Sequence, residues 1–196
     1  MSDDLYDPYL VSAFSLPNRL LRVTWAVINV IFFRHSPRPF HRWRAFLLRR
    51  FGAQLGDNVH IYPKASIWAP WNLVCADTVA IADGAIIYNP SLVTLGSHAT
   101  ISQEAYICGA THAYDDPAFP LLAFPIAVCD HAWICARATV QPGVQVGEGA
   151  VLALGSVATR DLEPWTVYGG IPARKLKHRL HPNPTPYHQL QESSLR

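Results

Sequence analysis

His112 is the residue of this sequence best placed to do chemistry. It stands at the entrance of an interruption in a regular repeat, whereas the other histidines fall at repeat corners, at the end of a repeat or outside it. A neutral imidazole near pH 7 can accept a proton from a hydroxyl group, as a general base must. A histidine in a loop can also be an ordinary exposed side chain, so position alone leaves a catalytic and a surface role open.

The four cysteines, Cys75, Cys108, Cys129 and Cys135, offer little chemistry by comparison. They form no C-x-x-C pair and have no companion histidine at the spacing of a zinc site. Small thiols of this kind are typical of a reducing cytosol. The sequence therefore predicts free thiols, without disulfides and without a cysteine-bound metal.

The element that must position His112 is an internal repeat. From Leu55 to Leu152 a Leu, Ile or Val recurs every six residues, with two slips of two residues and one interruption. The residue four places further on is small at most repeats, and Gly, Asn or His often stands three places further on. These three types enter the left-handed backbone conformation of a tight corner at low cost. The predicted corner residues are Asn58, Gly84, His98, His131 and Gly149.

A period of six fits neither a helix, whose apolar side repeats about every 3.6 residues, nor an ordinary strand, which alternates about every two. It fits short strands joined by tight corners and stacked about 4.8 Å apart in parallel sheets. The sequence thus predicts an all-β hexapeptide-repeat solenoid over residues 53–172, with a loop ejected at residues 113–127. Long loops on a rigid scaffold often carry function.

Residues 1–52 precede the repeat and are predicted to form a helical arm. Helices are expected at residues 16–34 and 41–51, separated by a proline-containing break. The arm holds eight arginines and three aspartates, a net charge of +5, whereas the remainder holds 8 basic and 11 acidic residues, a net charge of −3. Two roles stay open: a cap over the end of the solenoid, or an interfacial contact with an anionic membrane. No recognition motif accompanies the charge, so no nucleic-acid partner is expected.

The composition and the chain ends set further limits. Charged residues make up 15% of the chain and hydrophobic residues 50%, a balance that excludes intrinsic disorder. The N-terminus is acidic, unlike a secretory signal, and the longest apolar run, at residues 23–33, is too short to span a bilayer. We therefore expect a cytoplasmic protein whose membrane contact, if it has one, is peripheral at the inner face of the inner membrane. Residues 173–196 are predicted to form a short helix followed by an extended, proline-rich tail.

Several segments together carry a family resemblance. They are IWAPWNL at residues 67–73, IYNP at 87–90, THAYDDPAFPL at 111–121, and shorter matches at 132–134, 140–144, 155–157 and 169–174. On these segments the chain resembles the colanic acid biosynthesis acetyltransferases, which belong with the galactoside and maltose O-acetyltransferases among the hexapeptide-repeat acyltransferases. The resemblance covers residues 16–180.

The resemblance implies a left-handed parallel β-helix, a homotrimer, and acetyl-CoA lying in a groove between neighbouring subunits. It also implies transfer of an acetyl group to a sugar hydroxyl in bacterial exopolysaccharide biosynthesis, without a metal ion. His112 would be the general base, and the backbone N–H of Ala136 would stabilise the oxyanion of the tetrahedral intermediate. The acceptor could be a free, nucleotide-linked or lipid-linked glycan, and the basic arm favours a lipid-linked one.

Positions that match the family supply the remaining site residues. Asn89, Tyr114 and Asp115 would contact the acceptor. The cofactor would be bound by Trp133, Ala136, Leu154, Thr159, Arg160, Arg174 and Lys177. Simpler interpretations are a corner residue for Asn89, interface packing for Trp133 and a solvated basic end for the cations. Two positions depart from the family pattern: Ala136 replaces a frequent serine but keeps its N–H, and Leu154 replaces a small alanine near the cofactor.

Two alternatives stay open beside an acetyl-CoA-dependent O-acetyltransferase. An enzyme of the same fold could use another acyl-CoA or a non-glycan acceptor, and a non-catalytic scaffold would keep only the repeat. A zinc enzyme of this fold would need three histidine ligands, two of them five residues apart. The fifth residue after His112 is Pro117, which excludes that site.

Overall fold

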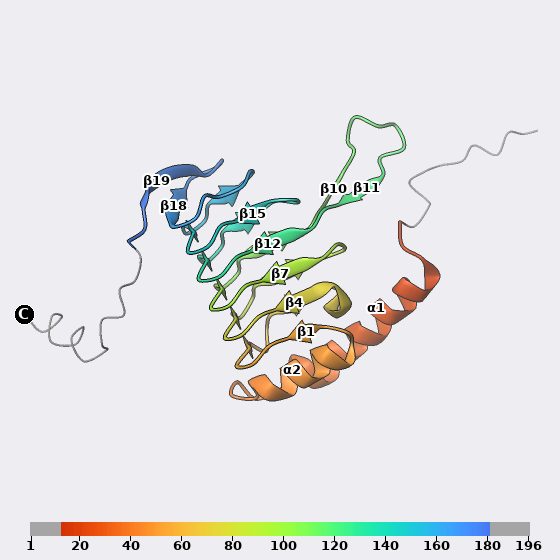
Figure 1. Ribbon diagram of the computed structural model, residues 1–196. Coiled ribbons are helices and arrows are strands. Elements are labelled where there is room, and N and C mark those ends of the chain that lie inside the picture. Colours follow the sequence, from red (N-terminus) through yellow and green to blue (C-terminus); the bar gives the residue numbers. More distant parts are fainter. Residues whose placement is uncertain (1–12, 181–196) are drawn as a thin grey trace, which may run out of the picture.

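The body of the chain is a three-sided parallel β-solenoid, seen in a computed structural model that describes residues 13–180 (Figure 1). Each turn of the chain adds one short strand to each of three sheets, which we call faces A, B and C. Face A contains β1 (Gln54–Leu55), β4 (Leu73–Cys75), β7 (Val93–Leu95), β12 (Ile126–Val128) and β15 (Gln145–Val146). Face B contains β2 (His60–Ile61), β5 (Ala80–Ile81), β8 (Thr100–Ile101), β13 (Trp133–Ile134), β16 (Val151–Leu152), β18 (Thr166–Gly169) and β19 (Arg174–His178). Face C contains β3 (Ser66–Ile67), β6 (Ile86–Tyr88), β9 (Tyr106–Cys108), β14 (Thr139–Val140) and β17 (Val157–Ala158).

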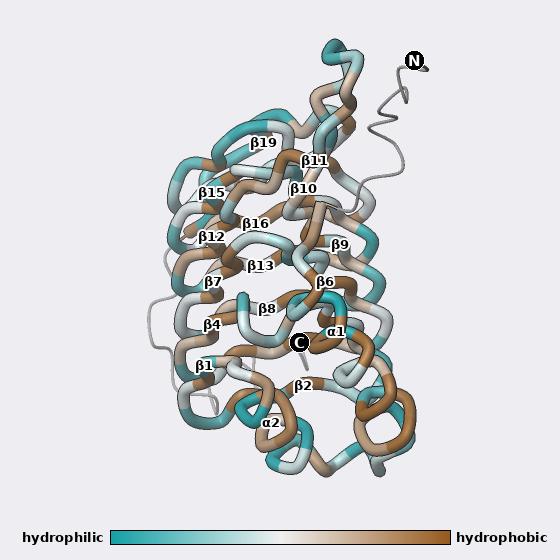
Figure 2. Tube along the Cα trace, turned by 90° about the vertical axis from the view of Figure 1, so that its right-hand side faces the viewer, coloured by the Kyte–Doolittle hydropathy of each residue, from teal (hydrophilic) through white to brown (hydrophobic). Residues whose placement is uncertain are grey.

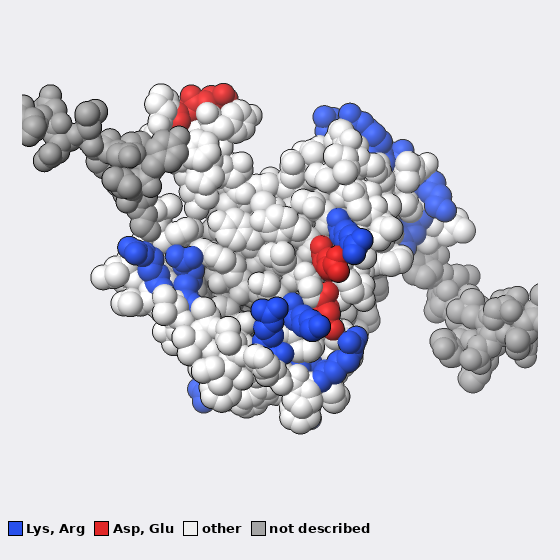
Figure 3. Space-filling model, turned by 180° about the vertical axis from the view of Figure 1, so that it is seen from behind, with Lys and Arg blue, Asp and Glu red and all other residues white. Residues whose placement is uncertain are grey.

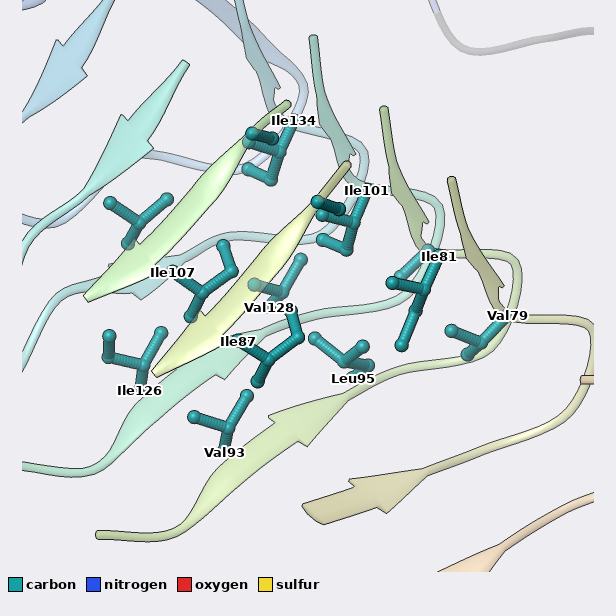
Figure 4. Close-up of a cluster of buried hydrophobic side chains, with 14 of the residues drawn as sticks. Val79, Ile81, Ile87, Val93, Leu95, Ile101, Ile107, Ile126, Val128 and Ile134 are labelled. Carbon is teal, nitrogen blue, oxygen red and sulfur yellow. The ribbon is translucent and has the colours of Figure 1, made fainter. Parts of the chain in front are cut away.

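The interior is the aliphatic column that the period of six predicts. Hydrophobic residues alternate along the trace with hydrophilic stretches (Figure 2). Ile81, Ile87 and Ile101 are fully buried, and stacked aliphatic side chains fill the space between the faces (Figure 4). Small residues such as Ala99 and Ala105 are fully buried beside them. Each buried aliphatic side chain stabilises the fold by about 1.5–3 kcal/mol, and the predicted hexapeptide-repeat solenoid is confirmed.

All five predicted corner residues adopt a left-handed backbone conformation. The angle φ is 53° at Asn58, 78° at Gly84, 60° at His98, 58° at His131 and 62° at Gly149. Few residue types reach this region without strain, which explains the choice of Gly, Asn and His. The rings of His98 and His131 also stack, with their centroids 4.9 Å apart, so these two histidines have a structural role.

The slips in the repeat arise at a single corner of the solenoid. Strands β4, β7 and β12 are three residues long and bury both of their end residues. The aligned partners are Leu55, Cys75 and Leu95, so the repeat continues through Cys75, with Leu73 as an additional inward residue. The extra residues and the long interruption all enter between faces C and A, at what we call the C–A corner.

The arm consists of α1 (Leu16–Ile28), a π-helical turn η2 (Asn29–Phe33) and α2 (His41–Arg50). These helices lie where the sequence pattern predicts them and cover the first turn of the solenoid (Figure 1). Trp25, Phe33 and Leu48 are buried in the same hydrophobic core as the strands. The arm therefore caps this end of the solenoid.

Side chains of the arm also satisfy the open edge of each face. An unpaired strand edge exposes carbonyl groups that could pair with another chain. Each face meets at least one donor from the arm: Arg49 Nη2 donates to the carbonyl of Leu55 on face A (3.0 Å), Arg44 Nε to that of Ile61 on face B (2.6 Å), and Trp25 Nε1 to that of Ile67 on face C (2.7 Å).

Arg44 is the most enclosed of these donors. It is fully buried, and its remaining N–H groups donate to Ser36 Oγ (2.8 Å) and to the carbonyls of Pro37 (2.9 Å) and Arg38 (2.6 Å). Burial lowers the pKa of the guanidinium, which nevertheless stays charged because arginine is so strong a base. Arg44 thus ties the link between the helices to the first strand of face B.

The C-terminal segment differs from the expectation. Residues Arg174–His178 form β19, antiparallel to β18, where a short helix was expected. Strand β18 is the last parallel strand of face B, so its outer edge needs backbone partners, and β19 supplies them. The expected proline-rich tail, like the acidic N-terminus, lies outside the described residues.

Between Ala13 and Leu180, no helix has both the length and the apolar character needed to cross a membrane.

Candidate active site

The interruption leaves the C–A corner as a β-hairpin. Strands β10 (Ala110–His112) and β11 (Leu121–Ala123) pair antiparallel, with His112 opposite Leu121. The hairpin projects from the body of the solenoid (Figure 1). The chain rejoins face A at Ile126, just before the predicted end of the loop at residue 127. His112 is therefore the last residue of an ordered strand, where the loop tip begins.

One backbone carbonyl fixes the tautomer of the His112 imidazole. Its Nδ1 lies 2.9 Å from the carbonyl oxygen of Phe119, and the two rings stack with centroids 4.3 Å apart and planes 11° apart. A carbonyl can only accept a hydrogen bond, so Nδ1 carries the proton. In the neutral ring Nε2 then keeps a free lone pair. This arrangement prepares His112 to take a proton through Nε2.

The loop tip around His112 is held by its own hydrogen bonds. The N–H of Ala113 donates to the carbonyl of Pro120 (3.0 Å), and the N–H of Phe119 donates to that of Asp116 (2.8 Å). Phe119 has a φ of 44°, which a bulky residue seldom adopts. A strained conformation of this kind persists only where the surroundings fix it, and here it accompanies the contact with His112.

Tyr114 and Asp115, the other loop residues expected to contact an acceptor, lie on the tip. Tyr114 is 76% exposed, and Asp115 is exposed beside it. Acidic side chains mark this projection on the surface (Figure 3). Both side chains are accessible, and their contact with an acceptor stays a prediction.

Asn89 lies one turn before the loop, at the same corner, and has a structural role there. It is fully buried. Its Oδ1 accepts from the N–H of Ala69 (2.9 Å), and its Nδ2 donates to the carbonyls of Ala69 (2.8 Å) and Asn72 (3.0 Å). These bonds hold the short helix η3 (Pro70–Asn72) of the preceding turn. The amide is thus buried and bonded to backbone, and the expected contact of Asn89 with an acceptor stays a prediction.

Three of the expected cofactor residues gather around a second corner, between faces B and C. Trp133 on β13 is 45% exposed and donates from Nε1 to Ser102 Oγ (2.8 Å). The carbonyl of Ala136 accepts from the N–H of Gly155 (3.1 Å), the residue that follows Leu154. Leu154 is 71% exposed. Ala136 and Leu154 therefore lie on neighbouring turns of this B–C corner.

The backbone N–H of Ala136 is free to bind a ligand. Within the part of the chain that the structure describes, it has no hydrogen-bond acceptor, and the residue is only partly buried. An N–H group fixed on a rigid corner can donate to a developing negative charge without reorganising. This geometry suits an oxyanion donor.

The remaining cofactor candidates lie at the C-terminal end of the solenoid. Thr159 and Arg160 directly follow β17, and Arg174 and Lys177 belong to β19. All four are exposed, and Lys and Arg side chains gather at this end of the molecule (Figure 3). Exposed cations of this kind can pair with phosphate groups.

The cysteines take no part in this arrangement. All four are free, and Cys75 and Cys135 are buried. Burial raises the pKa of the Cys75 thiol to about 12, which leaves it almost entirely protonated and unreactive at neutral pH. In residues 13–180, no three His, Cys, Asp or Glu side chains are grouped to hold a metal ion.

The two groups of expected site residues do not meet within one chain. His112 projects from the C–A corner and Ala136 lies at the B–C corner, with face C between them. Sequence reasoning also missed Phe119, which contacts His112. The contact combines a backbone carbonyl with a stacked ring, and both depend on how the loop folds back, which the local sequence pattern does not specify.

No family model matches this sequence. The chain is, however, 34% identical over 176 residues to the colanic acid biosynthesis acetyltransferase WcaF of Escherichia coli strain K12, a match that covers 87% of this chain and 97% of that protein. The chain belongs to this acetyltransferase family. The predicted family is therefore confirmed.

Other acetyltransferases are similar to this chain at lower identity. The galactoside O-acetyltransferase of Escherichia coli is 25% identical over 159 residues, which cover 74% of this chain and 73% of that protein. A hexapeptide-repeat acetyltransferase from Vibrio cholerae, solved with acetyl-CoA, superposes with a TM-score of 0.78 at 24% identity, covering 87% of this chain and 93% of that one. A maltose O-acetyltransferase from Clostridium difficile gives 0.72 at 20% identity, covering 85% and 90%. Both structures agree with the hexapeptide-repeat fold.

Proposed function

We propose that this acetyltransferase moves an acetyl group from acetyl-CoA to a sugar hydroxyl of a bacterial exopolysaccharide or its precursor. The observation that carries the proposal is the contact between His112 Nδ1 and the Phe119 carbonyl, which leaves Nε2 as the proton acceptor. Support for the cofactor comes from the acetyl-CoA complex of the Vibrio cholerae structure. Support for the acceptor class comes from the names of WcaF and the galactoside O-acetyltransferase.

The reaction is a direct attack of the acceptor on the thioester. His112 Nε2 takes the proton of the sugar hydroxyl while its oxygen bonds to the acetyl carbonyl carbon. The carbonyl oxygen becomes an oxyanion, to which the N–H of Ala136 donates a hydrogen bond. The intermediate then collapses, the carbon–sulfur bond breaks, and the CoA sulfur takes the proton from His112. The products are an acetylated sugar and free CoA, and His112 returns to its neutral form.

The site is assembled between subunits of a homotrimer. The base acts on the hydroxyl that attacks the acetyl carbonyl, and the oxyanion donor acts on the oxygen of that carbonyl, so the two must lie close together. His112 and Ala136, however, occupy different corners of a single solenoid. A neighbouring subunit could place its B–C corner against the hairpin of the first, and three such contacts would close a ring. The mass of the protein in solution tests this arrangement, and a stable, active monomer would contradict it.

Acetyl-CoA would lie along the B–C corner toward the C-terminal end. Trp133 offers an exposed ring for the pantetheine arm, and Arg160, Arg174 and Lys177, with Thr159 beside them, could bind phosphate and adenine groups. Leu154 projects where the family has a small residue, and it would narrow the groove at that point. We place the reaction in the cytoplasm, where acetyl-CoA is made.

A CoA-release assay tests the function. Free, nucleotide-linked and lipid-linked glycans are offered with acyl-CoAs of different chain length. His112→Ala should lower acceptor-dependent turnover by about 10²- to 10⁴-fold. His35→Ala is a matched control, because His35 Nδ1 also lies against a backbone carbonyl, that of Val30 (2.6 Å), but far along the chain from the hairpin. Undiminished turnover in His112→Ala would overturn the mechanism.

The same set of acceptors and acyl-CoAs also distinguishes an O-acetyltransferase from a related acyltransferase and from a non-catalytic scaffold. A chloramphenicol acetyltransferase of Klebsiella aerogenes is 41% identical, but over only 72 residues, or 34% of this chain. Chloramphenicol therefore belongs in the panel as a non-glycan acceptor. Turnover with that acceptor or with a longer acyl-CoA would identify a related acyltransferase, and no turnover with any pair would favour a scaffold.

A further inference from the structure

Helix α1 presents its apolar residues to solvent. Leu16, Leu20, Val23 and Val27 recur three or four residues apart on one side of the helix and are 63%, 60%, 63% and 51% exposed. Trp25, on the opposite side, is buried against the solenoid. The helix therefore has a covered side and an uncovered side, and the uncovered side is aliphatic.

Two polar residues of α1 lie instead toward the covered side. Asn18 and Arg22 are partly buried, and the Arg22 guanidinium lies 4.4 Å from the ring centroid of Trp68. A helix that served only as a cap would show the reverse pattern, with apolar residues inward and polar residues outward. A contiguous exposed apolar surface of this kind indicates a further contact.

The aliphatic side of α1 continues through η2 to α2. Val30, Ile31 and Phe32 are 54%, 55% and 48% exposed. On α2 the rings of Trp43 and Phe46 stack with centroids 5.7 Å apart, and Trp43 Nε1 donates to the carbonyl of Phe32 (3.0 Å). We call this surface the outer arm face; it comprises Leu16, Leu20, Val23, Val27, Val30, Ile31, Phe32, Trp43 and Phe46.

The charged side chains of the arm itself have one sign. Residues 13–52 contain eight arginines and no aspartate or glutamate. Arg19, Arg34, Arg42 and Arg50 are exposed, and Figure 3 shows Lys and Arg side chains on the lower part of the molecule, with acidic side chains beside some of them. Arg38 of the arm pairs with Asp83 of the solenoid (3.1 Å). The Arg50 guanidinium lies 5.4 Å from the ring centroid of Phe46, so cation and apolar surface are adjacent.

We infer that the outer arm face docks on an anionic lipid surface. Aliphatic and aromatic side chains would enter the boundary between headgroups and acyl chains, while the arginines pair with lipid phosphates. A second copy pairing through the same face would bring arginines against arginines, which is unfavourable. The inference goes beyond the acetyl transfer, since it depends neither on the acceptor nor on His112. It would hold the enzyme at the inner leaflet of the bacterial membrane.

Vesicle flotation of the full chain tests this docking. Vesicles of phosphatidylethanolamine with phosphatidylglycerol are compared with vesicles of phosphatidylcholine alone. Leu20→Gln/Val27→Gln removes apolar contacts, and Arg34→Gln/Arg42→Gln removes charge. Leu92→Gln/Leu180→Gln is the matched control, because these residues are 44% and 90% exposed but lie outside the arm. Thermal unfolding and solution mass are measured for every variant.

Docking predicts binding to anionic vesicles only, weakened about 10- to 30-fold in both arm variants. The control variant should bind like the natural chain, and all variants should keep the same mass and thermal midpoint. Failure of the natural chain to float with anionic vesicles would overturn the inference. Equal binding of the arm variants would also overturn it, and a change of mass in Leu20→Gln/Val27→Gln without a change in lipid binding would identify a subunit interface instead.

Discussion

The imidazole of His112 lies flat against the ring of Phe119, and the carbonyl of the same phenylalanine accepts a hydrogen bond from Nδ1. One residue therefore controls both the plane and the tautomer of the proposed base. The ring and the carbonyl can be separated by mutation, since a substitution removes only the ring.

Phe119→Ala should reduce kcat by roughly tenfold, less than the loss expected for His112→Ala. The variant keeps the carbonyl that fixes the tautomer but loses the ring that restrains the imidazole plane. Steady-state kinetics with acetyl-CoA and the best acceptor measure the effect. Activity equal to that of the natural chain would mean that the carbonyl alone positions His112.

Replacing either Arg160 or Arg174 by glutamine should raise the KM for acetyl-CoA by roughly tenfold and leave kcat nearly unchanged. Each arginine is proposed to make a charge-assisted hydrogen bond to a phosphate, and such a contact stabilises ground state and transition state alike. Lys64→Gln, an exposed cation near the arm, is the control. A fall in kcat at constant KM would refute this assignment.

Arg44→Met should lower the free energy of unfolding by about 3 kcal/mol, because several buried carbonyl groups lose their donor. Arg42→Met, an exposed position on the same helix, should change it by less than about 0.5 kcal/mol. Urea unfolding of both variants gives the comparison. Equal stability of the two variants would show that the buried guanidinium is dispensable.

The stability of the arm should decrease in mild acid because of His41. Burial lowers the pKa of His41, whose Nδ1 lies 3.0 Å from the carbonyl of Ile61. An unfolded histidine titrates near about 6.5, so below that pH the unfolded chain binds the proton more readily than the folded chain. The free energy of unfolding should therefore fall as the pH drops from about 6.5 through the folded pKa of His41. His41→Gln should flatten this dependence, and an unchanged pH profile in the variant would contradict the assignment.

The repeat made most of the fold predictable. A period of six and the residues at Asn58 and Gly84 require short strands and left-handed corners, whatever the surroundings. The register of the strands does not follow from the sequence, because Leu73 and Cys75 are both buried and the repeat pattern alone does not show which of them aligns with Leu55. Strand β19 was missed because an edge strand forms in response to its neighbour, and its own residues carry no strand pattern.

The candidate site was predictable only in part. His112 follows from its place at the ejected loop, which is a property of the sequence. The burial of Asn89 and the contact from Phe119 depend on how neighbouring turns stack, which the local pattern does not specify. Likewise, the separation of His112 and Ala136 becomes visible only when the corners are counted around the solenoid.

The donors that the arm offers to each face have a consequence for the length of the molecule. Trp25, Arg44 and Arg49 engage only the first turn, while β19 covers only the last strand of face B. Each interior turn contacts only the turns next to it. The contacts made by the arm and by β19 are therefore independent of the number of turns between them. A whole turn spliced between β5 and β8 would lengthen the solenoid by one layer and leave both ends sealed. The number of turns in this solenoid can therefore change, by gene duplication or by design, without altering the contacts at its two ends.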